Sequence, residues 1–106
     1  MAKLRHIAYR ANDVESMAGF FVNALEMSIV QRRRNGAIDL SDGTINITVL
    51  PMQTGSSSSD DVRPGVNHIG FTVPDDQVVA RAMEAAGARQ IGAIGDTDTA
   101  HYELKF

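Results

Sequence analysis

Two different spacings of apolar residues follow one another at the start of the chain. Residues 3–10 form a short β-rich segment, and Asn12 and Asp13 follow it as residues typical of a helix N-cap. The next apolar residues recur at the spacing of a helix with one buried face: Val14, Met17, Phe21, Ala24 and Leu25. The pattern therefore predicts a strand followed by an amphipathic helix.

Three further strands, arranged as a meander, are expected after this helix: residues 28–33, 37–40 and 44–50. Two turn dipeptides separate them, Asn35-Gly36 and Asp42-Gly43, and Pro51 ends the third strand. Residues 53–65 hold a glycine, four consecutive serines and a Pro-Gly pair, and they have too little apolar surface to pack. This composition indicates a flexible linker.

The same order of elements then begins again. A strand is expected at residues 66–73, followed by a helix that starts around Pro74 and ends at Gly87. The apolar stripe of that helix comprises Val78, Val79, Ala82, Met83 and Ala86. Strands at residues 88–93 and 101–106 complete the pattern, so the second half has one strand fewer than the first.

An internal repeat with a constant offset of 62 positions relates the two halves. Equivalent positions carry identical or similar residues: His6 and His68, Ile7 and Ile69, Ala8 and Gly70, Tyr9 and Phe71, Asp13 and Asp75. Such a repeat indicates two modules rather than one continuous fold. If a rotation relates the modules, the two histidines converge in one cleft.

Composition narrows the possible classes of function. The chain has 106 residues, and ten basic against thirteen acidic side chains give a net charge of −3, which argues against broad nucleic-acid binding. It has no cysteine, which excludes disulfide scaffolds and thiolate sites. No apolar run reaches the roughly 18–20 residues of a membrane span, so we expect a cytoplasmic protein. The basic run at residues 32–34 is interpreted as a solvated turn.

The repeated elements resemble those of the vicinal oxygen chelate superfamily, which contains glyoxalase I, bleomycin-resistance proteins and extradiol dioxygenases. Four segments carry the resemblance: residues 4–8 (LRHIA), 40–46 (LSDGTIN), 66–71 (VNHIGF) and 85–88 (AAGA). It implies an α+β fold of two βαβββ modules, each a half-barrel of mixed sheet, around a cleft. We expect the first module at residues 1–52, the linker at 53–65, and a second module at 66–106 that lacks its last strand.

The resemblance also implies a metal site in the cleft. His6 and His68 are at the positions of the first-strand ligands, and neutral imidazoles bind Zn, Ni, Fe or Mn ions well. The last strand of the first module is expected to offer Asn46 or Thr48, which share a face, as a third ligand or as substrate-binding groups. Because the family commonly has glutamate or glutamine there, this departure weakens the expected ligand set.

Other candidate residues depend on the same resemblance. The usual fourth ligand is a carboxylate on a final strand that this chain lacks, so Glu103 is a substitute as catalytic carboxylate or ligand, with His101 one pleat away. Arg10 follows His6 by four residues, where related proteins often bind a substrate carboxylate through a bidentate arginine.

Three functions remain open at this point. The first is a glyoxalase-like, divalent-metal-dependent enzyme, either a lyase or isomerase or a dioxygenase, acting on a small oxygenated substrate. The second is a metal-free small-molecule-binding protein of the bleomycin-resistance type, and the third is a truncated, inactive form of the enzyme. An incomplete sheet has an edge ready for pairing, so we expect a homodimer, without nucleic-acid or membrane partners.

Overall fold

A computed structural model describes residues 1–52, 63–95 and 103–106 of the chain. The elements follow the predicted order of strand, helix, three strands, then strand, helix and two strands. The chain divides into two compact units, of which the larger comprises residues 3–72 and the smaller comprises residues 1–2 and 73–106. The predicted linker falls mostly at residues 53–62, outside the described residues.

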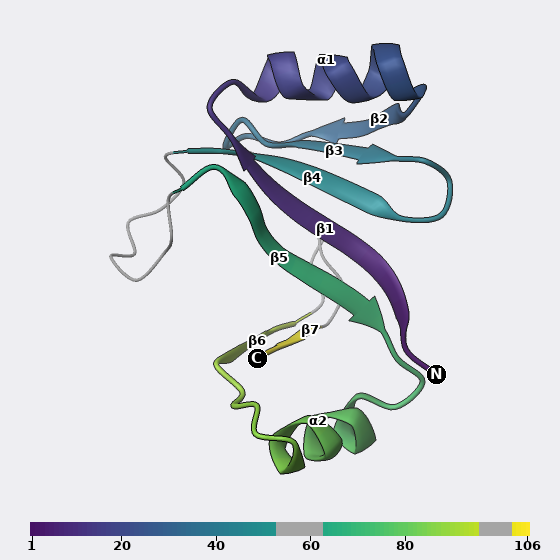
Figure 1. Cartoon of the computed structure of the whole chain (residues 1–106), viewed down its shortest axis with the longest axis vertical. Coiled ribbons are helices and arrows are strands. Elements are labelled where there is room, and N and C mark those ends of the chain that lie inside the picture. Colours follow the sequence, from purple (N-terminus) through teal and green to yellow (C-terminus); the bar gives the residue numbers. More distant parts are fainter. Residues whose placement is uncertain (53–62, 96–102) are drawn as a thin grey trace. The chain divides into compact units, whose positions relative to one another are not determined.

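A mixed five-stranded sheet forms the larger unit (Figure 1). Its strands are β1 (Lys3–Ala11), β2 (Ser28–Arg32), β3 (Ile38–Ser41), β4 (Asn46–Pro51) and β5 (Gly65–Thr72). They lie in the order β2-β3-β4-β1-β5, with β1 parallel to β4 and the other neighbours antiparallel. The first strand of the second module therefore extends the sheet of the first module.

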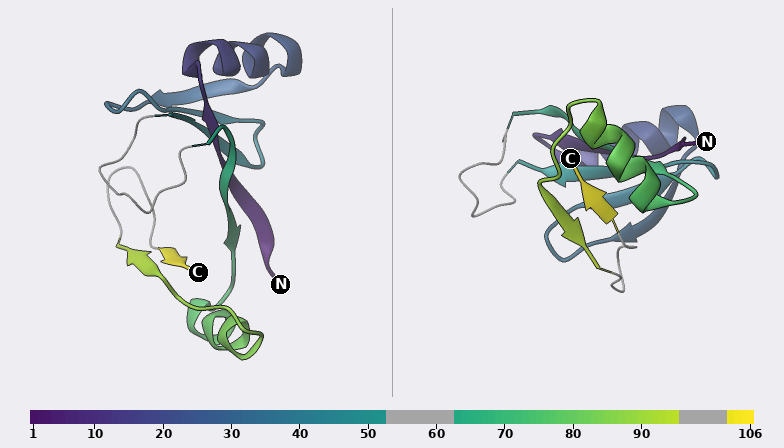
Figure 2. Two further views of the ribbon diagram at one scale, coloured as in Figure 1. Left: turned by 60° about the vertical axis from the view of Figure 1, so that its left-hand side comes forward. Right: turned by 90° about the horizontal axis from the view of Figure 1, so that it is seen from below.

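Helix α1 (Val14–Leu25) covers one face of this sheet (Figures 1 and 2). As predicted, Asp13 caps the helix, because its side chain accepts a hydrogen bond from the Ser16 backbone N–H at 3.0 Å. The buried core lies between α1 and the sheet and consists of Ala11, Ala18, Met27, Ile38, Leu40 and Val49. Because side chains alternate along a strand, the face that α1 does not cover carries His6, Arg10, Asp39, Asn46 and Thr48. We call it the open face because α1 does not cover it, although Arg10, Asp39 and Thr48 on it are themselves buried.

The apolar stripe predicted for α1 is correct at its start and wrong at its end. Val14, Met17 and Phe21 pack against the core, whereas Ala24 and Leu25 are exposed. The helix ends at Leu25, and Glu26 caps it in a left-handed conformation.

The smaller unit contains α2 (Asp76–Ala85) and the two-stranded antiparallel sheet of β6 (Gly92–Ile94) and β7 (Glu103–Lys105). Asp75 caps α2, so Pro74 precedes the helix instead of lying in its first turn. The strand predicted at residues 88–93 is shorter and lies later in the chain, because β6 begins at Gly92 and ends at Ile94. Neither described helix is long and apolar enough to cross a membrane.

Candidate functional site

Two histidines from the first strands of the repeat meet on the open face. The Nε2 atoms of His6 on β1 and His68 on β5 are 3.2 Å apart. Their ring centroids are 5.1 Å apart, and the ring planes are tilted by 49°. His6 is half-buried and His68 is exposed, so the meeting point is open to small molecules.

The pairing of β1 with β5 explains why the two rings meet. His6 lies opposite Gly70, and His68 lies opposite Ala8, so the two histidines are diagonal neighbours on one face. Both opposite residues are small and leave space for an imidazole. A Cβ atom placed on Gly70 would lie 3.3 Å from the Cβ of His6, so even a methyl group is a tight fit there.

Asparagine side chains hold the other nitrogen of each imidazole. Asn46 Nδ2 lies 3.4 Å from His6 Nδ1, and Asn67 Oδ1 lies 2.8 Å from His68 Nδ1. An amide nitrogen can only donate and an amide oxygen can only accept. With the amide atoms in these positions, the contacts agree with one direction of hydrogen bonding, in which Asn46 donates to His6, His6 donates to His68, and His68 donates to Asn67.

The separation of the two Nε2 atoms fits a shared metal ion. Two nitrogens at about 2.0–2.1 Å from one zinc ion in a tetrahedral site are about 3.3–3.4 Å apart. The observed 3.2 Å is close to that value, so the spacing of the two imidazoles is compatible with one shared ion. His6 would then carry its proton on Nδ1, which requires the Asn46 amide to present its oxygen.

Side chains that could add further metal ligands to His6 and His68 are fewer. Within residues 1–52, 63–95 and 103–106, no three histidine, cysteine or carboxylate side chains gather as a metal-binding group. Asn46 approaches His6 at Nδ1, on a different ring atom from the one that faces His68. Glu103 is exposed on β7 in the smaller unit, and His101 lies outside the described residues. The roles expected for Asn46, Glu103 and His101 stay predictions.

A buried carboxylate organises the open face on β3. Asp39 is 2% exposed, and its carboxylate accepts hydrogen bonds from Thr48 Oγ1 at 2.6 Å, Gln31 Nε2 at 2.7 Å and Arg33 Nε at 2.8 Å. Burial alone would raise the pKa of Asp39. The three hydrogen bonds and the positive charge of Arg33 outweigh that effect and hold the pKa below its ordinary value of 3.8.

This carboxylate changes the interpretation of two sequence features. Arg33 forms an ion pair with Asp39, so the basic run at residues 32–34 is not simply a solvated turn. Thr48, expected at the substrate or metal, is buried and donates its hydroxyl proton to Asp39. It lies on the open face beside Ala8, and its expected part in substrate binding is untested.

Arg10 lies deeper than a surface arginine at a strand end. It is 4% exposed, and its Nη1 donates to the Pro51 carbonyl oxygen at 3.0 Å. The guanidinium therefore helps to hold the end of β4 against β1. The alternation of side chains puts Arg10 on the open face with His6, where its predicted contact with a substrate carboxylate stays a prediction.

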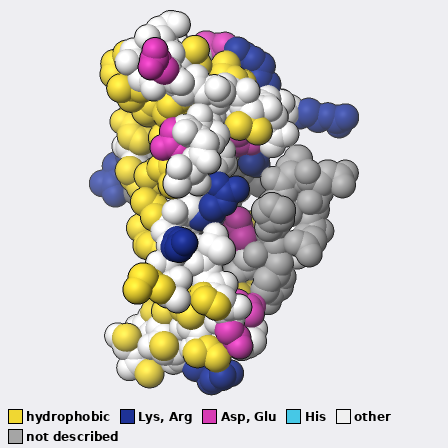
Figure 3. Space-filling model, turned by 90° about the vertical axis from the view of Figure 1, so that its right-hand side faces the viewer, with side chains coloured by type: hydrophobic (Ala, Val, Ile, Leu, Met, Phe, Trp, Pro, Cys, Tyr) yellow, Lys and Arg dark blue, Asp and Glu magenta, His cyan; other side chains and the backbone are white. Residues whose placement is uncertain are grey.

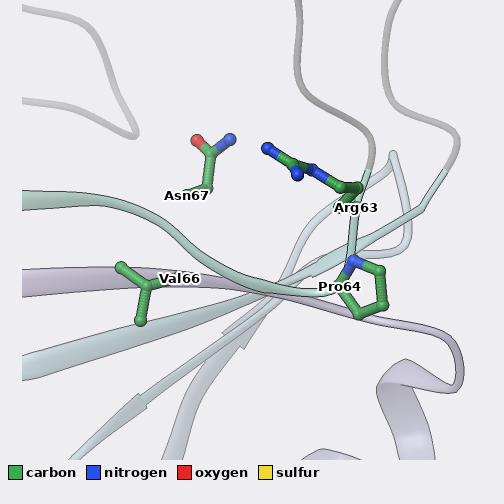
Figure 4. A pocket seen from close by; sticks show the side chains of 4 residues that line it. All are labelled: Arg63, Pro64, Val66 and Asn67. Carbon is green, nitrogen blue, oxygen red and sulfur yellow. The ribbon is translucent and has the colours of Figure 1, made fainter.

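A pocket of about 270 Å³ lies at the start of β5 (Figure 4). Arg63, Pro64, Val66 and Asn67 line it. The side chains of Arg63 and Asn67 point toward one another on one side of the strand, and that of Val66 points to the other side. Asn67 thus connects this pocket with His68.

Sequence reasoning missed several residues that build this site. The repeat makes Gly70 the equivalent of Ala8, but the space that Gly70 gives to His6 depends on strand pairing. Asn67 directly precedes His68, and its contact depends on a local irregularity of β5. The clustering of Gln31 and Asp39 with Thr48 needs the register of three strands.

Comparisons with known proteins agree on the fold. A family model described as Glyoxalase/Bleomycin resistance protein/Dioxygenase superfamily matches residues 3–106. The crystal structure of a hypothetical protein from Bacillus halodurans C-125 is 19% identical, has a TM-score of 0.70, and the match covers 97% of this chain and 83% of that one. No curated protein gives a significant match.

Two methylmalonyl-CoA epimerases are also similar in structure. The enzyme from Mycobacterium tuberculosis is 20% identical with a TM-score of 0.65, and the match covers 89% of this chain and 71% of that one. A variant of the Streptomyces coelicolor enzyme, in complex with 2-nitronate-propionyl-CoA, is 18% identical with a TM-score of 0.60 and coverage of 85% and 73%. At these identities the likeness concerns the fold.

Proposed function

Because the chain belongs to the Glyoxalase/Bleomycin resistance protein/Dioxygenase superfamily, we propose that it is a divalent-metal-dependent enzyme acting on a small oxygenated substrate. His6 and His68 are the proposed ligands of a Zn, Ni, Fe or Mn ion. The observation that carries this proposal is the 3.2 Å separation of their Nε2 atoms. It matches the spacing of two nitrogen ligands on one ion without any rearrangement of the backbone.

Each residue then has a defined task. A divalent ion supplies Lewis-acid polarisation of substrate oxygens when it is bound. The two histidines offer their Nε2 lone pairs to the ion, and the paired strands hold the rings at the required separation. Arg10, Asn46 and Thr48 all lie on the open face, where we propose that they bind or orient the substrate. Lyase, isomerase and dioxygenase chemistry all fit this description.

Metal titration tests the proposal directly. We expect isothermal titration calorimetry to show one ion bound per chain, and Co²⁺ loading to give the absorption bands of a nitrogen-coordinated site. His6→Ala and His68→Ala should largely abolish binding. Lys3→Ala and Thr72→Ala change exposed residues on the same two strands and are the matched controls. Equal metal uptake by all four variants would contradict the proposal.

Glu103 is the proposed carboxylate of the reaction or of the ligand set. Glu103→Gln removes its charge and preserves its size, so it separates these possibilities. A fall in metal affinity would make Glu103 a ligand, whereas a fall in activity at unchanged affinity would give it a role in proton transfer. If neither quantity changes, Glu103 has no part in the site.

One observation favours a second function, metal-free binding of a small molecule as in bleomycin-resistance proteins. The chain of hydrogen bonds from Asn46 through both histidines to Asn67 is complete without an ion. A thermal-shift screen distinguishes the two functions, because a ligand that prefers the folded state raises the melting temperature. Stabilisation by aromatic or cationic compounds that persists in the presence of a chelator would favour the binding protein.

We also propose that the protein forms a homodimer. β5 is an edge strand of the five-stranded sheet, and Val66, Ile69 and Phe71 on it are each more than half exposed. Exposed hydrophobic side chains are also visible among charged ones on the face in Figure 3. Unpaired edges and apolar surface favour association. Light scattering should give the mass of two chains, and a monomer mass at micromolar concentration would contradict the proposal.

A further inference from the structure

The strand β5 contains an irregularity directly before His68. Ala8 pairs with His68 and Tyr9 pairs with Val66, so Asn67 is an extra residue that faces no partner on β1. This arrangement is a β-bulge. Consecutive side chains of a regular strand point to opposite faces, which would separate Asn67 from His68. The bulge instead brings both side chains to one side, where Asn67 Oδ1 lies 2.8 Å from His68 Nδ1.

The direction of this hydrogen bond determines the state of the imidazole. An amide oxygen accepts, so the Nδ1 atom of His68 must carry the proton, and its Nε2 atom then has a lone pair. That Nε2 atom is the one that faces His6 at 3.2 Å. We propose that Asn67 is a positioning residue, which fixes the tautomer and orientation of His68 so that Nε2 is the ligating atom. The consequence for metal binding rests on the proposed function.

The bulge alone does not require this contact. A second bulge precedes His6, because Leu4 pairs with Phe71 and His6 pairs with Gly70, which leaves Arg5 as the extra residue. Arg5 is the repeat equivalent of Asn67, yet its Nη1 atom lies 3.4 Å from the Thr44 carbonyl oxygen. The same backbone feature therefore serves two different side-chain contacts. The amide of Asn67 is specifically suited to the imidazole beside it.

Asn67 also lines the pocket at the start of β5 with Arg63 (Figure 4). Its amide thus contacts His68 through the oxygen while the side chain forms part of the pocket wall. A substrate group that enters this pocket lies next to the residue that orients His68. A molecule bound in the pocket would therefore contact Asn67, and through Asn67 it would affect the orientation of the His68 imidazole.

The first test reads the tautomer of His68 in metal-free protein. Long-range ¹H–¹⁵N spectra at pH 8 distinguish a protonated from an unprotonated imidazole nitrogen. His6→Ala serves as the background, because it removes the hydrogen bond from His6 that would by itself favour a proton on His68 Nδ1. We expect Nδ1–H at His68 in His6→Ala, and a mixture of tautomers when Asn67→Ala is added, because the neighbouring hydrogen bond selects which nitrogen is protonated. Asn67→Asp retains an acceptor and should restore the Nδ1–H form. Asn23→Ala, at an exposed asparagine on α1, is the matched control.

The second test measures Zn²⁺ affinity of Asn67→Ala and Asn67→Asp with His6 in place. Loss of a residue that orients a metal-binding histidine typically costs about 10- to 100-fold in affinity, so we expect such a loss in Asn67→Ala and its recovery in Asn67→Asp. An unchanged His68 tautomer when Asn67→Ala is added to His6→Ala would overturn the inference. If the wild type binds no Zn²⁺, the proposed function fails, and the tautomer measurement still decides the role of Asn67.

Discussion

Ile7 on β1 lies directly opposite Ile69 on β5, and the register on either side of this pair is symmetric. His6 faces Gly70 and Ala8 faces His68, then one bulge follows in each direction. Gly70, which faces His6, is the repeat equivalent of Ala8. His68, which faces Ala8, is the repeat equivalent of His6. A local twofold axis passes between the two isoleucines, and the histidines are related by it.

Replacing Gly70 with valine should displace His6. A Cβ at this position is already 3.3 Å from the Cβ of His6, and a branched side chain adds two methyl groups in the same space. We expect changed His6 imidazole resonances and a loss of Zn²⁺ affinity, while a strand position tolerates valine in the backbone. Gly92→Val on β6, where no atom lies within 4 Å of an added Cβ, is the matched control. Unchanged His6 resonances in Gly70→Val would contradict this account.

Changing Asn46 to aspartate should strengthen metal binding. If His6 binds a metal through Nε2, its proton is on Nδ1. A carboxylate beside Nδ1 is then a better acceptor than the Asn46 amide, which must rotate to present its oxygen. We expect roughly a tenfold gain in Zn²⁺ affinity, and a loss in Asn46→Leu, which has no acceptor. Calorimetry measures both. Equal affinities of the aspartate and leucine variants would show that Asn46 has no influence on His6.

Asp39 should make the protein sensitive to acid. Its pKa is lower in the folded state than in the unfolded chain, so it stabilises the fold at pH values above about 4 and loses that effect as pH falls through its folded pKa. Asp39→Asn should cost about 2–4 kcal/mol at pH 7, because the partly exposed Arg33 loses its ion-pair partner and the buried carboxylate that accepts three hydrogen bonds is removed.

Urea unfolding at pH 7 and at lower pH values measures both effects. The wild type should lose stability on acidification more steeply than Asp39→Asn. Glu84→Gln, which removes an exposed carboxylate from α2, controls for the change in net charge. Parallel stability curves for the wild type and Asp39→Asn would contradict the role given to this carboxylate.

Leu40 should be among the most sensitive core positions. It is fully buried between α1 and the sheet, so Leu40→Ala loses apolar contacts and leaves a cavity. Such truncations cost about 2–5 kcal/mol. Leu25→Ala, at a residue that is 57% exposed, should cost less than about 1 kcal/mol. Denaturant unfolding of both variants checks the contrast, and equal losses would show that the core does not depend on Leu40.

The order of the elements and the meeting of His6 with His68 were predictable, because the repeat and the spacing of apolar residues are local properties of the sequence. Resemblance to the superfamily was also recognisable from the segments around these histidines, and the family match confirms it. An α+β fold with a mixed sheet follows from the same pattern.

Features that depend on strand register were not predictable in this way. The contact of Asn67 with His68 needs a bulge, and the hydrogen bonds of Asp39 need residues from three neighbouring strands. A charged side chain such as Arg10 is usually exposed, yet Arg10 is buried beside the end of β4. Helical spacing places Leu25 on the apolar stripe of α1, yet its side chain is 57% exposed, because spacing alone does not show which turns of a helix contact the sheet.

The two bulges at Arg5 and Asn67 give the paired strands equivalent backbones with unlike side chains next to each imidazole. The backbone around the two rings is therefore symmetric, whereas the side chains beside each ring differ. Exchanging the side chains at positions 5 and 67 would place the asparagine beside His6 instead of His68, and the pairing of β1 with β5 would stay the same.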